Sequence, residues 1–128
     1  MSRIWIIDDD DEMLNAIRLM LRVIRHETEG FPNARKAAQA LLAGRCPDAM
    51  IVDINMPEVS GLDLLEFVRR GAEWKQLPIL MLSTEAADVM IDRALALGAD
   101  GYVTKPVTIE ELERALKLAM QKRGKGIN

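Results

Sequence analysis

Three apolar runs constrain the fold of this chain more than any other feature. They are RIWII at 3–7, DAMIVDI at 48–54 and PILMLS at 78–83. None alternates between apolar and polar positions, which is typical of strands buried on both faces of a parallel sheet. The segments between them repeat their apolar residues at helical spacing. Each strand is therefore expected to be followed by a helix that covers the sheet.

Weaker signals complete the pattern. HETEGF at 26–31 and GYVT at 101–104 are expected to be short strands, and helices are expected over 13–24, 33–44, 64–70, 86–98 and 112–120. Capping signals begin three of these helices: Asn33, the pair Ser60 and Asp63, and the pair Thr108 and Glu111. The sequence predicts an α/β fold in which a doubly wound, five-stranded parallel sheet alternates with five helices.

Composition limits the class of protein. The chain has 128 residues and a net charge of −3, which suits one domain and argues against direct binding of nucleic acid. Cys46 is the single cysteine, so no internal disulfide can form, which fits the cytoplasm. No segment is apolar enough to cross a membrane. We expect a domain over 1–122 and a polar tail, or the start of a linker, over 123–128.

Polar side chains gather where the predicted strands end. In a doubly wound sheet, ligands bind beyond the carboxyl ends of the strands. Those ends carry three carboxylates, an amide, a hydroxyl and an ammonium group: Asp8, Asp9, Asp53, Asn55, Ser83 and Lys105. Such a set of hard oxygen ligands suits Mg²⁺, and the lysine is placed to hold an anion. Asp10, Asp11 and Glu12 are expected in the first turn of the next helix, where the helix dipole favours anions.

Four segments at these strand ends resemble the receiver domain of two-component response regulators, and the chemotaxis regulators in particular. They are IIDDDDEM, MIVDINMP, PILMLSTEA and GADGYVTKPVTIEEL, and the resemblance runs from about Arg3 to Gln121. It implies a flavodoxin-like fold with strand order 2-1-3-4-5. It also implies that the domain signals by accepting a phosphoryl group and is not itself an enzyme.

The resemblance assigns roles to individual residues. Asp53 matches the aspartate that accepts a phosphoryl group from the phosphohistidine of a histidine kinase. The Mg²⁺ ligands would be Asp9, Asp53 and the backbone carbonyl of Asn55, with Asp8 acting through a bound water. Lys105 matches the lysine that pairs with the acceptor and then with its phosphoryl oxygens.

Further matches concern switching. Ser83 matches the hydroxyl that moves toward the phosphoryl group, Tyr102 the aromatic switch, and Pro106 a proline that often follows a cis bond. Thr84 stands where the family usually has alanine. Asn55 and Glu85 occupy positions that tune hydrolysis of the phospho-aspartate, and polar residues at both predict a short-lived phosphorylated form.

The implied partners are a sensor histidine kinase or phosphotransfer protein and a downstream protein or output domain. Control of that partner is expected through the fourth helix, fifth strand and fifth helix. Dimerisation through those helices is compatible with the family, although nothing in the sequence supports it.

Other interpretations stay open. Taken singly, Asp53 could cap a strand end, Lys105 could lie on the surface, Ser83 could cap a helix and Tyr102 could be core. A Mg²⁺-dependent phosphatase of the haloacid dehalogenase class also uses a strand-end aspartate, but DINMP lacks that class's second carboxylate. A flavodoxin-like cofactor binder would need a phosphate loop after the first strand, where four aspartates stand instead. A phosphorylation-independent receiver-like module is the remaining alternative. Trp74 lies in a polar connection and receives no function.

Overall fold

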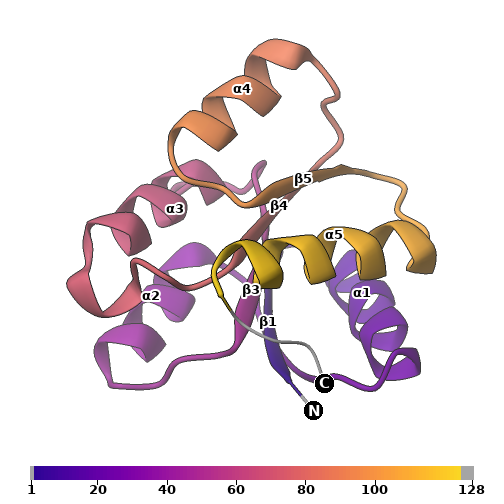
Figure 1. Cartoon of the computed structure of the whole chain (residues 1–128), viewed down its shortest axis with the longest axis horizontal. Coiled ribbons are helices and arrows are strands. Elements are labelled where there is room, and N and C mark those ends of the chain that lie inside the picture. The colour runs from indigo at the N-terminus through magenta and orange to yellow at the C-terminus, as the bar shows by residue number, and fades with distance from the viewer. Residues whose placement is uncertain (1, 125–128) are drawn as a thin grey trace.

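Five parallel strands form one sheet in the order β2-β1-β3-β4-β5, as predicted (Figure 1). The computed structural model describes residues 2–124, so residues 125–128 of the expected tail lie outside the described residues. The strands are β1 (Arg3–Ile7), β2 (Glu27–Phe31), β3 (Ala49–Asp53), β4 (Ile79–Ser83) and β5 (Gly101–Thr104). The three apolar runs of the sequence thus form β1, β3 and β4, which are the three central strands of the sheet.

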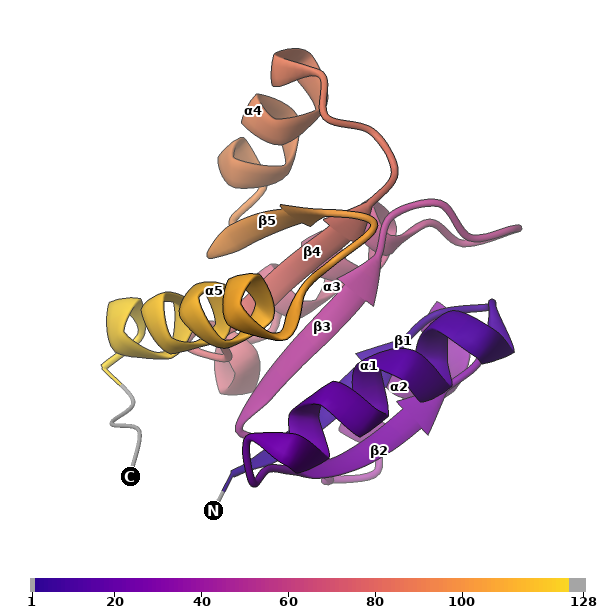
Figure 2. The same ribbon diagram turned by 90° about the vertical axis from the view of Figure 1, so that its right-hand side faces the viewer.

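Helices cover both faces of this sheet (Figure 2). They are α1 (Asp11–Val23), α2 (Ala34–Leu42), α3 (Gly61–Arg70), α4 (Asp88–Ala96) and α5 (Ile109–Lys122). One buried cluster joins the sheet to α2, α3 and α4, and a second joins the other face to α1 and α5. The alternate residues of β1 divide between the clusters: Trp5 and Ile7 face α2 and α3, while Ile4 and Ile6 face α1 and α5.

Helix starts follow the predicted capping signals. The Asn33 side chain accepts from the Lys36 backbone N–H at 2.9 Å. Complete capping boxes are present at Ser60 with Asp63 and at Thr108 with Glu111. In the acidic run, the structure corrects the prediction by one residue. Asp10 is the N-cap of α1 and not part of its first turn. Its carboxylate accepts two backbone N–H groups, so it is stabilised by direct hydrogen bonds.

The connection after α3 differs from the prediction. A 3₁₀ helix, η1, forms at Ala72–Trp74, and Trp74 is only 8% exposed. Its ring lies 5.4 Å from that of Phe67, between ring centroids. Trp74, which the sequence places in a polar connection without a function, is therefore part of the hydrophobic core. Within the described residues, no helix is long and apolar enough to cross a membrane.

Candidate functional site

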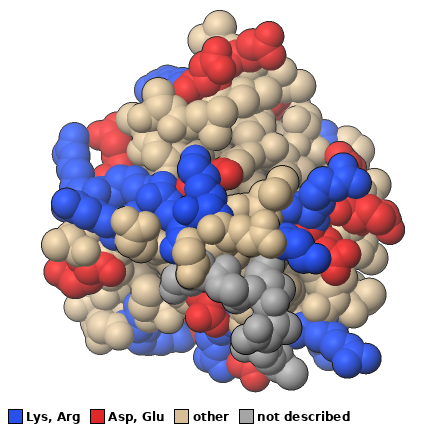
Figure 3. Space-filling model, viewed as in Figure 1, with Lys and Arg blue, Asp and Glu red and all other residues tan. Residues whose placement is uncertain are grey.

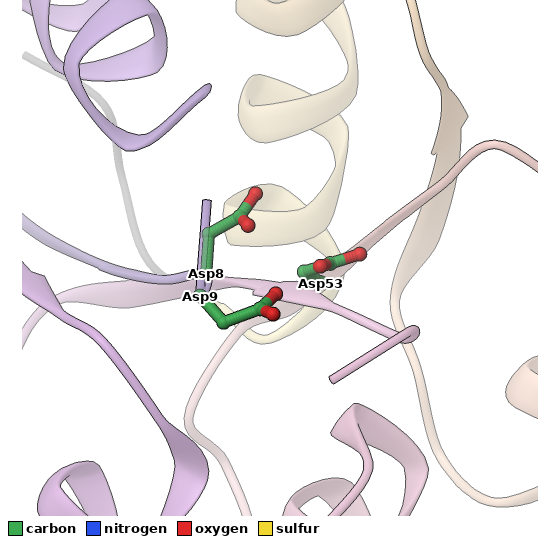
Figure 4. Close-up of side chains that lie close together, drawn as sticks. All are labelled: Asp8, Asp9 and Asp53. Atoms are coloured by element: carbon green, nitrogen blue, oxygen red, sulfur yellow. The ribbon is translucent and has the colours of Figure 1, made fainter. Parts of the chain in front are cut away.

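Three carboxylates meet at the carboxyl ends of β1 and β3. The two strands pair in parallel with Ile7 opposite Val52, so the residues that follow are brought side by side. Asp8, Asp9 and Asp53 each offer an oxygen within 4.8 Å of the others (Figure 4). Asp8 is fully buried and Asp53 is 3% exposed, whereas Asp9 is open to solvent. The strand pairing thus forces acidic groups together despite their mutual repulsion.

Among residues 2–124, one ammonium group faces this cluster. Lys105 Nζ lies 3.3 Å from Asp8 Oδ2 and 3.4 Å from Asp53 Oδ1. Lys105 follows directly after β5, so this lysine comes from the opposite end of the sequence. A single positive charge cannot balance three carboxylates, two of them buried. The residual negative charge and the all-oxygen ligand set fit a bound divalent cation of the Mg²⁺ type.

The charge imbalance affects the pKa of Asp53. Burial and, after it, the nearby Asp8 carboxylate raise the pKa of Asp53 from 3.8 to about 6. Lys105 and a 3.3 Å hydrogen bond from the Asn55 backbone N–H act in the opposite direction. Asp53 is therefore ionised at neutral pH, at an energetic cost that an additional positive charge would offset.

Close backbone packing fixes the position of Asp53. A Cβ atom at Gly61 would overlap the backbone carbonyl oxygen of Asp53, so only glycine lets α3 begin here. The Gly61 N–H donates to the carbonyl of Ile54 at 3.1 Å and closes the intervening loop. The first turn of α3 is thereby held against the end of β3.

A chain of hydrogen bonds leads away from Asp53. The Ser83 hydroxyl is fully buried and accepts from the Asn55 amide Nδ2 at 3.4 Å and from the Glu85 backbone N–H at 3.0 Å. The Glu85 carbonyl in turn accepts from the Tyr102 hydroxyl at 2.8 Å. Because Ser83 accepts twice, its own hydrogen is the group it can donate. The Asn55 side chain thus links the end of β3 to β4, and the Glu85 backbone links β4 to Tyr102 in β5.

The structure therefore groups most of the residues singled out in the sequence, but not all. Thr84 is exposed on the loop after β4 and lies outside this hydrogen-bonded chain. The Lys105–Pro106 bond is cis. Two links were not predicted: the side-chain contact of Asn55 with Ser83, and the backbone contacts of Glu85. Nothing in the sequence indicates them, because they depend on the path that the loops take in space.

Comparison with known proteins gives a consistent result. A sequence profile of the response regulator receiver domain matches residues 4–117. The chain is 35% identical to the chemotaxis protein CheY-3 of Vibrio cholerae over 121 residues, covering 89% of this chain and 88% of that protein. The structure is also similar to that of Vibrio cholerae CheY4, with a TM-score of 0.83 and 30% identity, covering 91% of this chain and 97% of that one.

Other relatives are much longer. The chain is 29% identical to the protein RcaC of Microchaete diplosiphon over 121 residues, which span 94% of this chain but only 18% of that protein. Similarity therefore extends both to proteins of about this length and to proteins in which the matched part is a small fraction of the whole.

Proposed function

Because the chain belongs to the response regulator receiver domain family, we propose that Asp53 accepts a phosphoryl group from the phosphohistidine of a sensor kinase or phosphotransfer protein. One observation carries this proposal. Asp53 is a buried carboxylate held between Lys105 and two further acids, which is a poor arrangement for a purely structural group. Receiver domains are signalling domains, and no turnover of an external substrate is proposed.

In the transfer, a carboxylate oxygen of Asp53 forms a bond to phosphorus while the bond from phosphorus to the imidazole nitrogen of the donor breaks. With a pKa of about 6, Asp53 is in the nucleophilic, ionised form at neutral pH. Phosphoryl transfer depends mainly on positioning and charge stabilisation. Lys105, which bridges Asp8 and Asp53, is placed to pair with the phosphoryl oxygens once the new bond forms.

The acidic residues would hold Mg²⁺. Asp9 and Asp53, the carbonyl of Asn55 and, through water, Asp8 are the proposed ligands. When bound, the cation would reduce the repulsion between the anionic donor and the carboxylates. Between them, these groups supply only oxygen ligands, in agreement with the preference of Mg²⁺.

The hydrogen-bonded chain provides a route from Asp53 to the surface. A phosphoryl group adds about −1.5 to −2 charge and three acceptor oxygens. We propose that it attracts the Ser83 hydroxyl, which loosens the contacts of the Glu85 backbone that hold Tyr102. The face formed by α4, β5 and α5 would change with it and alter affinity for a downstream protein or output domain. We expect these partners, and this chain, in the cytoplasm.

The test is direct. The protein is incubated with Mg²⁺ and acetyl phosphate, and intact mass is recorded beside an Asp53→Asn control. We expect the gain of one phosphoryl group, absent from the variant and absent when Mg²⁺ is chelated. A folded protein that gains no mass and also fails to bind beryllofluoride would contradict the proposal. Steady release of phosphate from a generic phosphomonoester would support the phosphatase alternative instead.

A further inference from the structure

The hydroxyl of Ser83 is a buried group whose hydrogen has no acceptor among residues 2–124. Ser83 is the last residue of β4 and is fully buried. Its oxygen accepts from the Asn55 amide Nδ2 at 3.4 Å and from the Glu85 backbone N–H at 3.0 Å. A buried donor without an acceptor lowers the stability of a fold, so this hydroxyl would gain from an acceptor that arrives later.

The two N–H groups determine which bond the hydroxyl can add. A hydroxyl oxygen has two lone pairs and one hydrogen. Asn55 and Glu85 together occupy both lone pairs of Ser83, so the one further bond open to it is a bond in which it donates. Donors on the oxygen also polarise the O–H bond and strengthen that donation. The next partner of Ser83 must therefore be an acceptor such as an anionic oxygen.

The two donors differ in what they require of the sequence. The Glu85 N–H lies two residues after Ser83, which is the local turn that a serine forms with the backbone whatever the residue there. The Asn55 contact joins two loops across 28 positions of the chain and uses a side-chain amide. The contribution of Asn55 is thus the one that depends on the type of residue.

The backbone of Asn55 is held in place on both sides. Its own N–H donates to Asp53 Oδ1 at 3.3 Å. The Ile54 N–H donates to the Leu82 carbonyl at 2.9 Å and ties this loop to β4. The Met56 N–H donates to the Ile54 carbonyl at 3.1 Å, which closes a tight turn around Asn55. The amide therefore extends from a fixed base, and one residue contacts both Asp53 and the Ser83 hydroxyl.

We propose that Asn55 is a positioning residue, whose amide keeps the Ser83 hydroxyl oriented as a hydrogen-bond donor for an anionic oxygen carried by Asp53. The inference rests on the proposed function, because that oxygen would belong to the phosphoryl group. It gives the Asn55 side chain a role separate from that of its backbone carbonyl, the proposed Mg²⁺ ligand. It is also separate from orienting the water that hydrolyses the phospho-aspartate, because it acts through Ser83.

A double-mutant cycle tests this dependence on Ser83. The probe is beryllofluoride, whose fluorine atoms stand in for the phosphoryl oxygens, and its affinity is measured by ¹⁹F NMR at saturating Mg²⁺. Ser83→Ala should weaken binding more than about tenfold, because a bond to a charged acceptor is lost. Asn55→Ala should weaken it by about three- to tenfold. In the Asn55→Ala background, Ser83→Ala should cost less than about threefold, since the hydroxyl is no longer held as a donor.

Two further variants separate donation from shape and charge. Asn55→Asp keeps the shape of the side chain but cannot donate, so it should reproduce the pattern of Asn55→Ala. Glu58→Gln, exposed in the same loop, should match the parent in both Ser83 backgrounds. Asn55 is itself exposed, so its variants remove no core packing, and circular dichroism checks that each protein is folded.

The possible outcomes are distinct. Independent effects of Asn55→Ala and Ser83→Ala, whose losses simply multiply, would overturn the positioning role and leave the proposed function intact. Full affinity in Asn55→Asp would overturn it as well, because shape alone would then suffice. A folded parent protein that binds no beryllofluoride would overturn the proposed function, and this inference with it.

Discussion

A buried aspartate side chain lies at each end of the sheet, and the charges that surround the two are opposite in balance. At the carboxyl end, Asp53 shares the single ammonium group of Lys105 with Asp8. At the amino end, the side chain of Asp100, just before β5, is inaccessible to solvent and is surrounded by donors. Arg69 Nη2 lies 2.9 Å and Arg123 Nε 2.7 Å from its oxygens, and the Ile79 N–H donates at 2.9 Å.

The cations around Asp100 are themselves well satisfied. Arg69 also donates to the carbonyls of Gly98 and Leu77, and Arg123 to those of Gly98 and Lys75. These bonds join the ends of α3 and α5 to the start of β5, and Figure 3 shows the basic side chains collected on that part of the surface. Because Arg123 takes part in them, the ordered contacts extend one residue past the expected domain limit at 122.

The difference separates a structural carboxylate from a reactive one. Around Asp100 positive charge exceeds negative charge, and Arg69 and Arg123 also donate to backbone carbonyls. Around Asp53 negative charge is in excess, so binding of a cation lowers the electrostatic energy of the site. Burial alone does not distinguish the two, since both side chains are almost inaccessible. The number and sign of the neighbouring charges distinguish them.

The largest expected change in the free energy of unfolding comes from removing the aspartate at the amino end of the sheet. Asp100→Ala should lower the free energy of unfolding by about 3 to 5 kcal/mol, because two largely covered guanidinium groups lose their buried counter-ion. Urea denaturation measures this, with Asp92→Asn on the exposed face of α4 as a control within about 0.5 kcal/mol of the parent. A loss below about 1 kcal/mol would show that the arginines are held by the backbone carbonyls alone.

At the carboxyl end, removal of the buried negative charge is expected to raise the free energy of unfolding. The pKa of Asp53 rises on folding from 3.8 to about 6, so the folded state binds the proton more tightly and stability falls as pH increases through this window. At pH 7 the ionised group costs up to about 3 kcal/mol. Asp53→Asn should therefore stabilise the protein at pH 7 in the presence of a chelator.

Urea denaturation of this variant at several pH values provides the check. The stabilisation should shrink as pH falls below about 6 and disappear below about 3.8, where the parent side chain is neutral in both states. A variant that is less stable than the parent at pH 7 would mean that the pairing with Lys105 outweighs the cost of burial.

Binding of Mg²⁺ is expected to change the free energy of unfolding by a smaller amount. A ligand that binds only the folded state, at about ten times its Kd, stabilises by about 1.4 kcal/mol. Thermal denaturation should show an increase in Tm with MgCl₂ that is absent in Asp9→Asn, in which an exposed oxygen ligand has been weakened. If an equal ionic strength of NaCl raises Tm as much as MgCl₂, the acidic cluster is not a specific cation site.

The smallest effect on stability belongs to Glu85. The contacts of this residue with Ser83 and Tyr102 use its backbone, so Glu85→Ala should change the free energy of unfolding by less than about 0.5 kcal/mol. If the side chain helps to orient the water that hydrolyses the phospho-aspartate, the phosphorylated form should persist longer. Loss of the phosphoryl group followed by mass spectrometry measures this, and an unchanged rate in the variant rejects the role.

The carboxyl end of the sheet was accessible to prediction for a physical reason. Strands buried on both faces are recognisable as apolar runs, and parallel strands place their last residues at one edge. The positions of Asp53, Ser83 and Lys105 therefore follow once the strands are located. The capping residues were predictable because their contacts span only three positions in the chain.

The amino end was not predictable in the same way. Asp100 and Arg123 lie in a turn and at a helix end, where the sequence indicates only exposed polar residues. Their contact depends on where α5 ends in space relative to β5. Trp74 was missed for a similar reason, since a single aromatic residue in a short polar segment carries no periodicity. Contacts set by tertiary packing have no local signature.

The separation of Asp8 and Lys105 has a consequence for synthesis. They are 97 residues apart in the chain, and at about 5 to 20 residues per second a ribosome needs about 5 to 20 s to connect them. Until β3 is complete at Asp53, the apolar segment of β1 lacks one of the two strands that flank it in the finished sheet. Four ionised aspartates directly after an apolar strand oppose association with other nascent chains. The acids that later face the phosphoryl group would thus first protect the emerging chain from aggregation.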